Sequence, residues 1–105
     1  MYAQLTYFDG PRTPAQVAAA DFAGTHRIAP AVAKVPGVQH AYVLRREDGS
    51  EIVVSFAETE QALVEAQKAI MGTELLPDED PALLTGPDRV EIYPVVQEYQ
   101  PGGHS

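Results

Sequence analysis

The pattern of apolar and polar residues predicts four β-strands. Four segments rich in β-branched and aromatic residues are bounded by glycine, proline or aspartate, as strands commonly are. The predicted strands cover residues 2–8, 38–46, 52–56 and 89–99. Pro94 interrupts the last of them, and proline is tolerated in a sheet only at an edge or an irregularity because it lacks a backbone N–H group.

The first helix is predicted over residues 15–35, where apolar residues recur at helical spacing. Thr13 is a suitable N-cap, Pro14 fits the first helical position, and Gln16 completes a capping box. Pro30 removes a backbone donor and clashes with the preceding turn. We therefore expect a kink or two helical segments at that point.

The second helix is predicted over residues 59–71 and ends at Gly72. The order of elements is then β-α-β-β-α-β. This order is typical of an α+β, ferredoxin-like fold, with an antiparallel sheet and two helices on one face. A chain of 105 residues suits one domain. We expect that domain to span residues 1–99 and residues 100–105 to form a flexible tail.

Asp48-Gly49 predicts a two-residue hairpin turn between the middle strands. With that turn, Leu44 lies opposite Val53 and Tyr42 lies opposite Ser55. One face then packs against the helices and carries Ala41, Val43, Ile52, Val54, Phe56, Val90 and Ile92. The opposite face carries Val38, His40, Tyr42, Leu44, Val53, Ser55, Tyr93 and Val95.

That opposite face is an apolar patch that a monomer would expose to water. A second copy of the chain is the simplest cover, and two sheets packed face to face form a closed α+β barrel. We therefore expect a homodimer. The alternative is an ordinary sheet face with scattered aromatic residues in contact with water.

Four short motifs follow one another along the first half of the chain: Arg27-Ile28-x-Pro30, Pro36-Gly37-Val38, Ala41-Tyr42-Val43-Leu44-Arg45 and Asp48-Gly49. Together they resemble the dimeric α+β barrel superfamily, and in particular its antibiotic-biosynthesis monooxygenase-like members. The resemblance extends from the first strand to Val96. It implies a homodimer whose ligand lies between the helices and the sheet. Some relatives are cofactor-free oxygenases of aromatic polyketides, others degrade or bind haem, and many have no assigned activity.

The sequence departs from these relatives in its residue types. The haem-degrading members use an Asn, a Trp and a His, whereas this chain contains neither Asn nor Trp. This argues against haem degradation, and it also weakens the comparison with the polyketide oxygenases, which rely on Asn and Trp. EthD-like relatives place a His two residues before the helix Pro, but here His26 precedes Pro30 by four positions.

Composition excludes several classes of function. The net charge of −8 argues against nucleic-acid and anionic membrane partners. The absence of cysteine excludes thiol chemistry. No signal peptide or membrane-spanning segment is visible, so we expect a cytoplasmic protein. The charge is uneven, however: residues 1–46 carry a net +3 and residues 47–105 a net −11. A small anionic ligand near Arg27 or Arg45 remains compatible with this distribution.

His26 is the candidate catalytic residue, because an imidazole exchanges protons near neutral pH. Arg27 is a candidate contact for an anionic ligand. The alternative for His26 is an ordinary surface or capping side chain. His26, His40 and His104 have no metal-ligand spacing, so we expect no metal site.

Tyr7, Tyr42 and Tyr93 lie on predicted strands and are candidate ligand-binding residues, since a phenol presents a flat apolar body and a polar tip. A tyrosine with a lowered pKa would also deprotonate a phenolic substrate. The alternative is a structural role in the core or at an interface.

These observations predict a small-molecule-binding protein that takes a hydrophobic aromatic compound. Cofactor-independent monooxygenation of an aromatic or polyketide-like compound is the activity that the resemblance implies, and we expect no cofactor. The alternative is a non-catalytic binding or assembly protein without an open active site.

Overall fold

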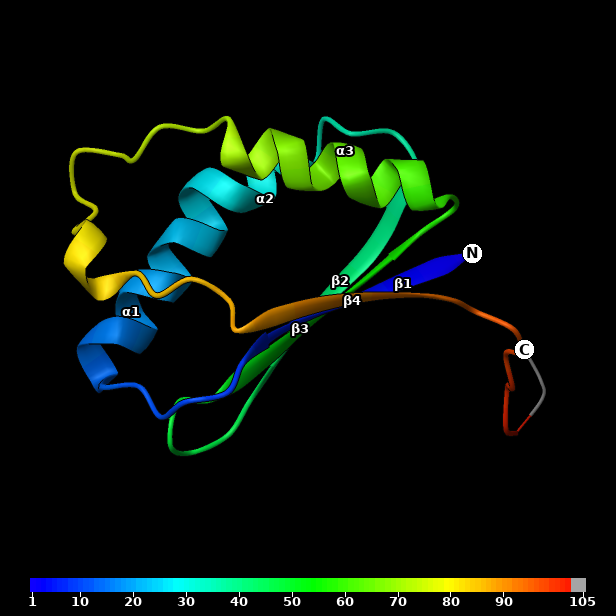
Figure 1. Ribbon diagram of the computed structural model, residues 1–105, viewed down its shortest axis with the longest axis horizontal. Coiled ribbons are helices and arrows are strands. Elements are labelled where there is room, and N and C mark those ends of the chain that lie inside the picture. The colour runs from blue at the N-terminus through cyan, green and yellow to red at the C-terminus, as the bar shows by residue number, and fades with distance from the viewer. Residues whose placement is uncertain (103–105) are drawn as a thin grey trace.

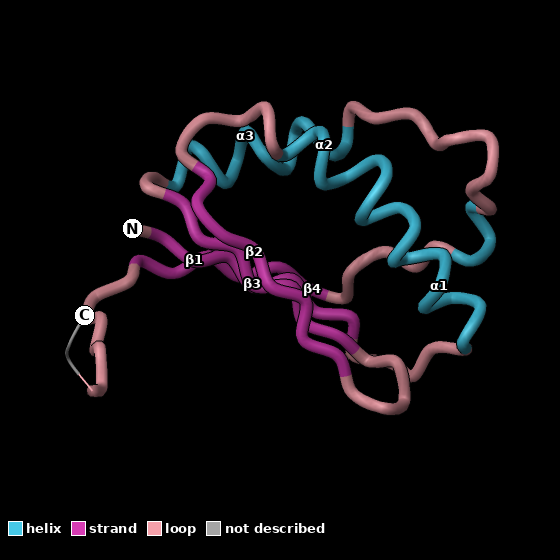
Figure 2. Tube along the Cα trace, turned by 180° about the vertical axis from the view of Figure 1, so that it is seen from behind, coloured by secondary structure: helices cyan, strands magenta, loops and turns pink. Residues whose placement is uncertain are grey.

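The computed structural model describes residues 1–102 (Figure 1). The sheet contains β1 (Tyr2–Phe8), β2 (Val38–Arg45), β3 (Glu51–Ala57) and β4 (Arg89–Pro94). The helical segments are α1 (Pro14–Ala23), the π-helical turn η1 (Gly24–Ile28), α2 (Ala29–Val32), α3 (Glu60–Met71) and the short 3₁₀ turn η2 (Pro81–Leu83). Strand order is β2-β3-β1-β4 and every neighbouring pair is antiparallel. The helices lie on one side of the sheet (Figures 1 and 2), which confirms the ferredoxin-like α+β prediction.

The first helix begins as its sequence predicts. Thr13 Oγ1 accepts a hydrogen bond from Gln16 N at 3.1 Å, and Gln16 Oε1 accepts one from Thr13 N at 2.8 Å. The predicted interruption near Pro30 is also present, as η1. Ala29 N donates to Gly24 O, so the turn before the proline is one residue wider than an α-helical turn.

The hairpin between β2 and β3 differs from the prediction. Arg46 N donates to Ser50 O at 2.9 Å and Gly49 N donates to Arg46 O at 3.0 Å, so the loop is three residues long, Glu47 to Gly49. Gly49 has a φ of 90°, the left-handed conformation that closes such a loop and that glycine adopts without strain. The predicted two-residue turn is therefore wrong.

The longer loop moves the register by one residue. Leu44 lies opposite Ile52 and Tyr42 lies opposite Val54. Because directly opposite residues share a sheet face, the one-residue change moves all of β3 to the other face relative to β2. A β-bulge between Val38 and His40 also turns Val38 toward the helices.

The two faces can now be assigned from Ala57, which packs against Leu63 of α3. We call the helix-facing side the inner face; it carries Tyr2, Gln4, Thr6, Ala41, Val43, Val53, Ser55, Ala57, Val90 and Ile92. We call the other side the open face; it carries Ala3, Leu5, Tyr7, His40, Tyr42, Leu44, Ile52, Val54, Phe56, Arg89, Glu91 and Tyr93.

The predicted faces were therefore partly wrong. Ile52, Val54 and Phe56 lie on the open face, whereas Val53 and Ser55 point toward the helices. The positions predicted on β2 from Ala41 onward, and the inward position of Ile92, are confirmed.

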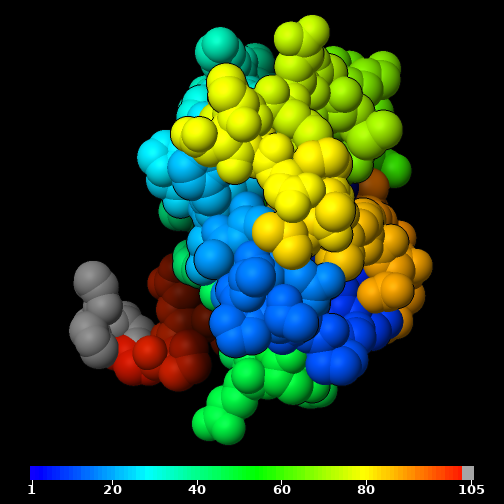
Figure 3. All heavy atoms as spheres, turned by 90° about the vertical axis from the view of Figure 1, so that its left-hand side faces the viewer, coloured from blue at the N-terminus to red at the C-terminus, as the bar shows by residue number. Residues whose placement is uncertain are grey.

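The apolar core lies under α3. Ala57, Ala62 and Leu63 are buried together, and Tyr2, Val38 and Ile92 pack around them. By contrast, α1 does not have its main contacts with the sheet (Figure 2). Apart from η1, which continues the same helix, the element that α1 mainly contacts is η2. Figure 3 shows the chain around η2 lying against α1 on this side of the molecule.

Two further predictions concern the ends of the chain and the membrane. The last three residues of the predicted tail 100–105, His104 among them, lie outside the described residues. Within residues 1–102, every helix is too short or too polar to cross a bilayer.

Candidate functional site

The part of the inner face that lies toward α1 is polar at its centre. Two ladders of opposite residues cross it: Ala41, Ser55, Gln4 and Ile92 form one, and Val43, Val53, Thr6 and Val90 form the other. The side chains on the two central strands thus include an amide and two hydroxyl groups. A sheet face that packs against helices normally carries apolar side chains, because buried polar groups need partners.

This part of the inner face is also accessible. Val43 points toward the helix layer and yet is 57% exposed, and Ala41 is exposed beside it. Gln4, on the central strand, is only 9% exposed. The region therefore combines a solvent-accessible apolar edge with hydrogen-bonding groups deeper in, a combination typical of small-molecule sites.

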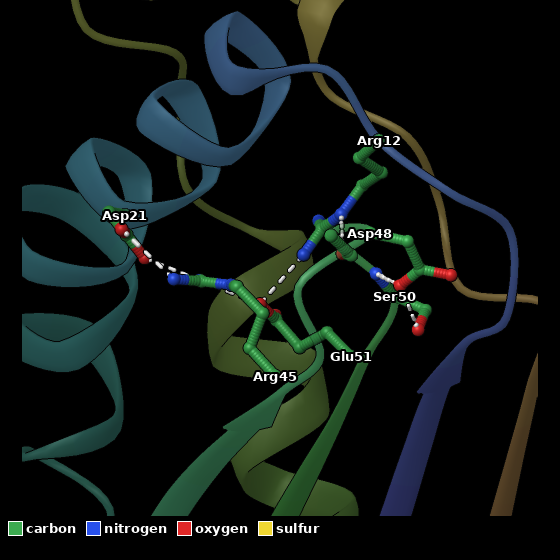
Figure 4. Close-up of polar contacts among 7 residues, drawn as sticks. Arg12, Asp21, Arg45, Asp48, Ser50 and Glu51 are labelled. Atoms are coloured by element: carbon green, nitrogen blue, oxygen red, sulfur yellow. Dashed lines mark hydrogen bonds and ion pairs between the residues drawn. The ribbon is translucent and has the colours of Figure 1, made fainter.

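Polar contacts join α1 and the segment before it to the β2–β3 hairpin beside this region (Figure 4). Arg12 Nη2 lies 2.7 Å from Glu51 Oε1, and Arg12 Nε donates to Gly49 O at 2.8 Å. Arg45 contacts the same Glu51 oxygen at 2.7 Å and Asp21 of α1 at 2.6 Å. Asp21 and Glu51 raise the pKa of Arg45 by hydrogen bonding, against a smaller lowering by desolvation.

The hairpin loop is held in place by its own side chains. Ser50 donates to Asp48 Oδ1 from both its backbone N, at 2.9 Å, and its hydroxyl, at 2.6 Å. These two bonds lower the pKa of the Asp48 carboxyl group. The backbone N of Arg12 donates to Asp48 O at 2.8 Å, which joins this loop to the segment before α1.

Arg27 holds the far end of the helix layer. Its guanidinium contacts both carboxylate oxygens of Glu79, at 2.7 and 3.1 Å, and donates to Thr73 Oγ1 at 2.8 Å. Glu79 also accepts from Leu76 N at 2.8 Å, and these bonds lower its pKa. The anion-binding role predicted for Arg27 stays a prediction, and an incoming anion would have to compete with Glu79.

His26 is exposed on η1, with its ring centroid 4.6 Å from that of Phe22. The helix layer therefore carries His26 and Arg27, while the three candidate tyrosines lie across the sheet from it. The structure does not bring the predicted catalytic and ligand-binding groups together in a single protomer.

Tyr7, Tyr42 and Tyr93 all lie on the open face. The Tyr42 and Tyr93 side chains are about half exposed, at 52% and 51%. Tyr42 stacks near His40, with 6.2 Å between ring centroids, and Arg89 lies 3.8 Å above the Tyr7 ring. A hydrogen bond to Glu91 raises the pKa of Tyr7, so this phenol stays protonated at neutral pH and does not meet the condition for a base.

Sequence reasoning missed Gln4, Thr6 and Arg12 as candidate site residues and placed Ser55 on the wrong face. The polar alternation of Gln4 and Thr6 along a predicted strand was visible in the sequence. It became informative only when the register assigned that side of β1 to the helix layer. Within residues 1–102, no three His, Asp or Glu side chains gather closely enough to hold a metal ion.

No protein-family model and no curated protein sequence matches this chain. Solved structures do match it. A mutant of MhuD with two manganese protoporphyrin IX molecules bound per active site is 19% identical, with a TM-score of 0.65 over 95% of this chain and 99% of that one. A monooxygenase from the gene ActVA-Orf6 of Streptomyces coelicolor, in complex with nanaomycin D, is 18% identical, with a TM-score of 0.60 over 95% of this chain and 91% of that one. The resemblance to the antibiotic-biosynthesis monooxygenase-like proteins is thus confirmed at the level of the fold: the chain has the ferredoxin-like fold of these two structures.

Proposed function

We propose that the protein binds an aromatic or polyketide-like small molecule between α1 and the inner face of the sheet. The observation that carries this proposal is the exposure of Val43, 57%, on the face that points toward the helices. Ala41, Val43 and Val53 supply apolar contacts for a flat ring system. Gln4, Thr6 and Ser55 supply hydrogen bonds for its oxygen substituents.

The two structural neighbours support a ligand of this kind. One is a monooxygenase in complex with nanaomycin D, and the other holds manganese protoporphyrin IX in its active site. At below 20% identity this support comes by analogy of fold, so the chemistry must rest on the residues of this chain.

We propose cofactor-independent monooxygenation as the reaction. In the oxidation of an anthrone, a base removes a proton from the ring CH₂ group, and the carbanion transfers electrons to O₂. One oxygen atom becomes the new ketone of the quinone and the other leaves as water with the two hydrogens of the CH₂ group. His26 is the proposed base. The alternative is a binding protein that performs no reaction.

We also propose a homodimer formed through the open face. On this face the large side chains of Tyr42, Leu44 and Tyr93 are each more than half exposed. Beyond β4, Val95 N still donates to Met1 O at 2.8 Å, and Val96 and Tyr99 are then 85% and 75% exposed. A second copy would cover both the sheet and these side chains, and it would bring Tyr7, Tyr42 and Tyr93 inside a closed barrel.

Light scattering tests the dimer, and the expected mass is twice the monomer mass of 11.3 kDa. A monomer at every measured concentration would contradict it. Tyr93→Glu should shift the protein toward the monomer, because a carboxylate covered by the partner loses its hydration.

Two neighbouring substitutions test the ligand site. Val43→Trp places a bulky side chain on the inner face, whereas Leu44→Trp places the same side chain on the open face of the same strand. The probes are anthrone, a naphthohydroquinone and manganese protoporphyrin, assayed by thermal shift. We expect at least one probe to stabilise the wild type and Leu44→Trp but not Val43→Trp. Stabilisation by none of them, or equal stabilisation of both variants, would overturn the inner-face site.

Oxygen consumption then separates the enzyme from the binding protein. If anthrone binds, it should be oxidised with uptake of one O₂ per molecule, and His26→Gln should lower the rate while leaving the thermal shift unchanged. Binding without oxygen uptake would favour the non-catalytic alternative.

A further inference from the structure

The inner face of the sheet is charged along the ladder that follows Val43. Arg45, Glu51 and Phe8 lie opposite one another on β2, β3 and β1, and they share this face with Val43. Arg45 follows Val43 by two positions on the same strand, so their Cα atoms are about 7 Å apart. A flat ligand that lies on Val43 can therefore reach the Arg45 guanidinium with a substituent at its edge.

Arg45 is held by two carboxylates, one from the sheet and one from the helix layer. Its Nη2 lies 2.7 Å from Glu51 Oε1, and Arg12 contacts the same oxygen. Asp21 of α1 accepts hydrogen bonds from both ends of the guanidinium fork, at 2.6 Å from Nη2 and 3.3 Å from Nη1. Figure 4 shows Arg45 extending from β2 toward Asp21 on the helix. The pair therefore connects the two layers between which the proposed ligand lies.

The two carboxylates differ in how readily a ligand can replace them. The Glu51 side chain is 7% exposed and binds two arginines, so it stays in place. The Asp21 side chain is 57% exposed, and exposed ion pairs of this kind contribute little to stability. The carboxylate of a ligand can therefore replace Asp21 on the Arg45 fork while Asp21 turns toward water.

The charges around Arg45 limit how much such a ligand gains. Asp21 is the only charged residue of α1, and the hairpin beyond β2 adds three charged residues. With Arg12, Arg45 and Glu51, three arginines then stand against four carboxylates; the hairpin members are Arg46, Glu47 and Asp48. Asp21 also stays attached to α1 after the exchange and repels the incoming carboxylate. We therefore expect a preference of a few fold and not a large increase in affinity.

From this arrangement we propose that the inner-face site selects an aromatic compound that carries a carboxylate, and that Arg45 is the residue that recognises it. The inference rests on the proposed function, since it places the rings of the ligand on Val43. Arginine suits the task because its planar fork matches the two oxygens of a carboxylate, as it does for Asp21. Asp21 competes with the ligand for this fork.

The test compares two probes that share a ring system and differ in charge: anthraquinone-2-carboxylate and the neutral alcohol 2-(hydroxymethyl)anthraquinone. Both are already quinones, so they bind without being oxidised. Calorimetry measures their affinities for the full-length chain. We expect the carboxylate to bind about threefold more tightly than the alcohol at low salt, and added salt should reduce this preference.

Asp21→Asn gives the decisive result, because it removes the competing carboxylate and leaves Arg45 in place. It should strengthen binding of the carboxylate probe about threefold and leave the affinity for the alcohol unchanged. A merely structural ion pair would give no such gain. Asp78→Asn makes the same change in net charge in the exposed loop after α3 and should alter neither affinity. Arg45→Gln, checked for folding by circular dichroism, should abolish the preference for the carboxylate.

Three results would overturn the proposal: equal affinity of the wild type for the two probes, an equal gain in Asp21→Asn and Asp78→Asn, or carboxylate binding that survives Val43→Trp. The first of these, with the alcohol still bound by the wild type but not by Val43→Trp, would leave the proposed inner-face site standing. Binding of neither probe to the wild type would overturn both proposals.

Discussion

The two ends of the helix layer are attached to the same sheet by different means. Under α3 the contact is apolar, and Leu63, 1% exposed, closes over Ala57 and Tyr2. Under α1 the helix is attached to the sheet by polar contacts at the end of the sheet next to the hairpin. These contacts are made by Arg12 and Asp21 with their ion-pair partners. The difference matters because an apolar contact must fill the space between two layers, whereas ion pairs at the edges leave it accessible.

The sequences of the two helices explain the difference. In α3, apolar residues follow helical spacing and three of them are buried: Ala62, Leu63 and Ala66. In α1 half of the residues are alanine, and only Ala23 is buried. Alanine favours the helical backbone but offers little area to bury, so α1 can stand away from the sheet as a stable helix.

The largest expected effect comes from the apolar end. Leu63→Ala should lower the free energy of unfolding by about 3 kcal/mol, because it leaves a cavity in the region where α3 and the sheet pack tightly. Urea denaturation measures this loss. Met71→Ala is the control on the same helix: that side chain is 76% exposed, and its removal should change stability by less than about 0.5 kcal/mol.

The next effect tests the hairpin that anchors α1. Gly49 has a φ of 90°, and a Cβ there would lie 2.7 Å from Arg12 O. Gly49→Ala should therefore cost about 2 kcal/mol through backbone strain and displacement of the segment before α1. Gly10→Ala, where a Cβ meets nothing within 4 Å, is the matched control. Equal stability of the two variants in urea would show that the hairpin contact does not hold α1.

The buried ion pair at the other end of the helix layer should show a pH dependence. Glu79→Gln should lower the free energy of unfolding at pH 7, because Arg27 loses its charged partner. The Glu79 pKa lies below its ordinary value of 4.5, so the wild-type advantage is complete above that value. It is lost as pH falls through the lowered pKa, where the carboxylate becomes protonated.

Urea denaturation of both proteins across the acidic range measures this difference. The curves of the wild type and Glu79→Gln should converge at low pH. Glu65→Gln, an exposed residue with a 3.8 Å contact to Lys68, should show no comparable gap at any pH. A constant gap between wild type and Glu79→Gln down to the most acidic point would contradict the assignment.

The smallest effect is expected for the exposed contact between Asp21 and Arg45. Asp21 is 57% exposed as a side chain, so Asp21→Asn should cost about 0.5 kcal/mol at low salt. Added salt should remove the difference, because it screens exposed charges. Thermal unfolding at two ionic strengths measures this, with Asp78→Asn in the exposed loop as the control.

Much of the fold was predictable because its boundaries depend on local chemistry. The capping box of Thr13 and Gln16, the stop at Gly72 and the disturbance before Pro30 each involve residues close in the chain. The same holds for the order of the elements, which follows from where strands and helices begin and end.

The candidate site was not predictable in the same way, because it depends on register. Asp48-Gly49 fits both a two-residue and a three-residue hairpin loop, and only the backbone bonds of Arg46 distinguish them. The difference of one residue in loop length decides whether Ser55 or Phe56 faces the helices. Gln4 and Thr6 gain their meaning from this assignment, since they border Ser55 and Val53 on the same face. The contact between Arg27 and Glu79 spans 52 positions and has no local signal.

The wide turn η1 also determines which insertions and deletions the helix can accept. It holds one residue more than an α-helical turn, and Gly24 within it has open space at its Cβ position. Deleting one residue there would convert the wide turn into a regular α-helical turn. Because the wide turn already absorbs the extra residue, the segments on either side would keep nearly the same rotation about the helix axis. The turn η1 is therefore a position at which the helix can lose a residue while Asp21 and Arg27 keep their directions.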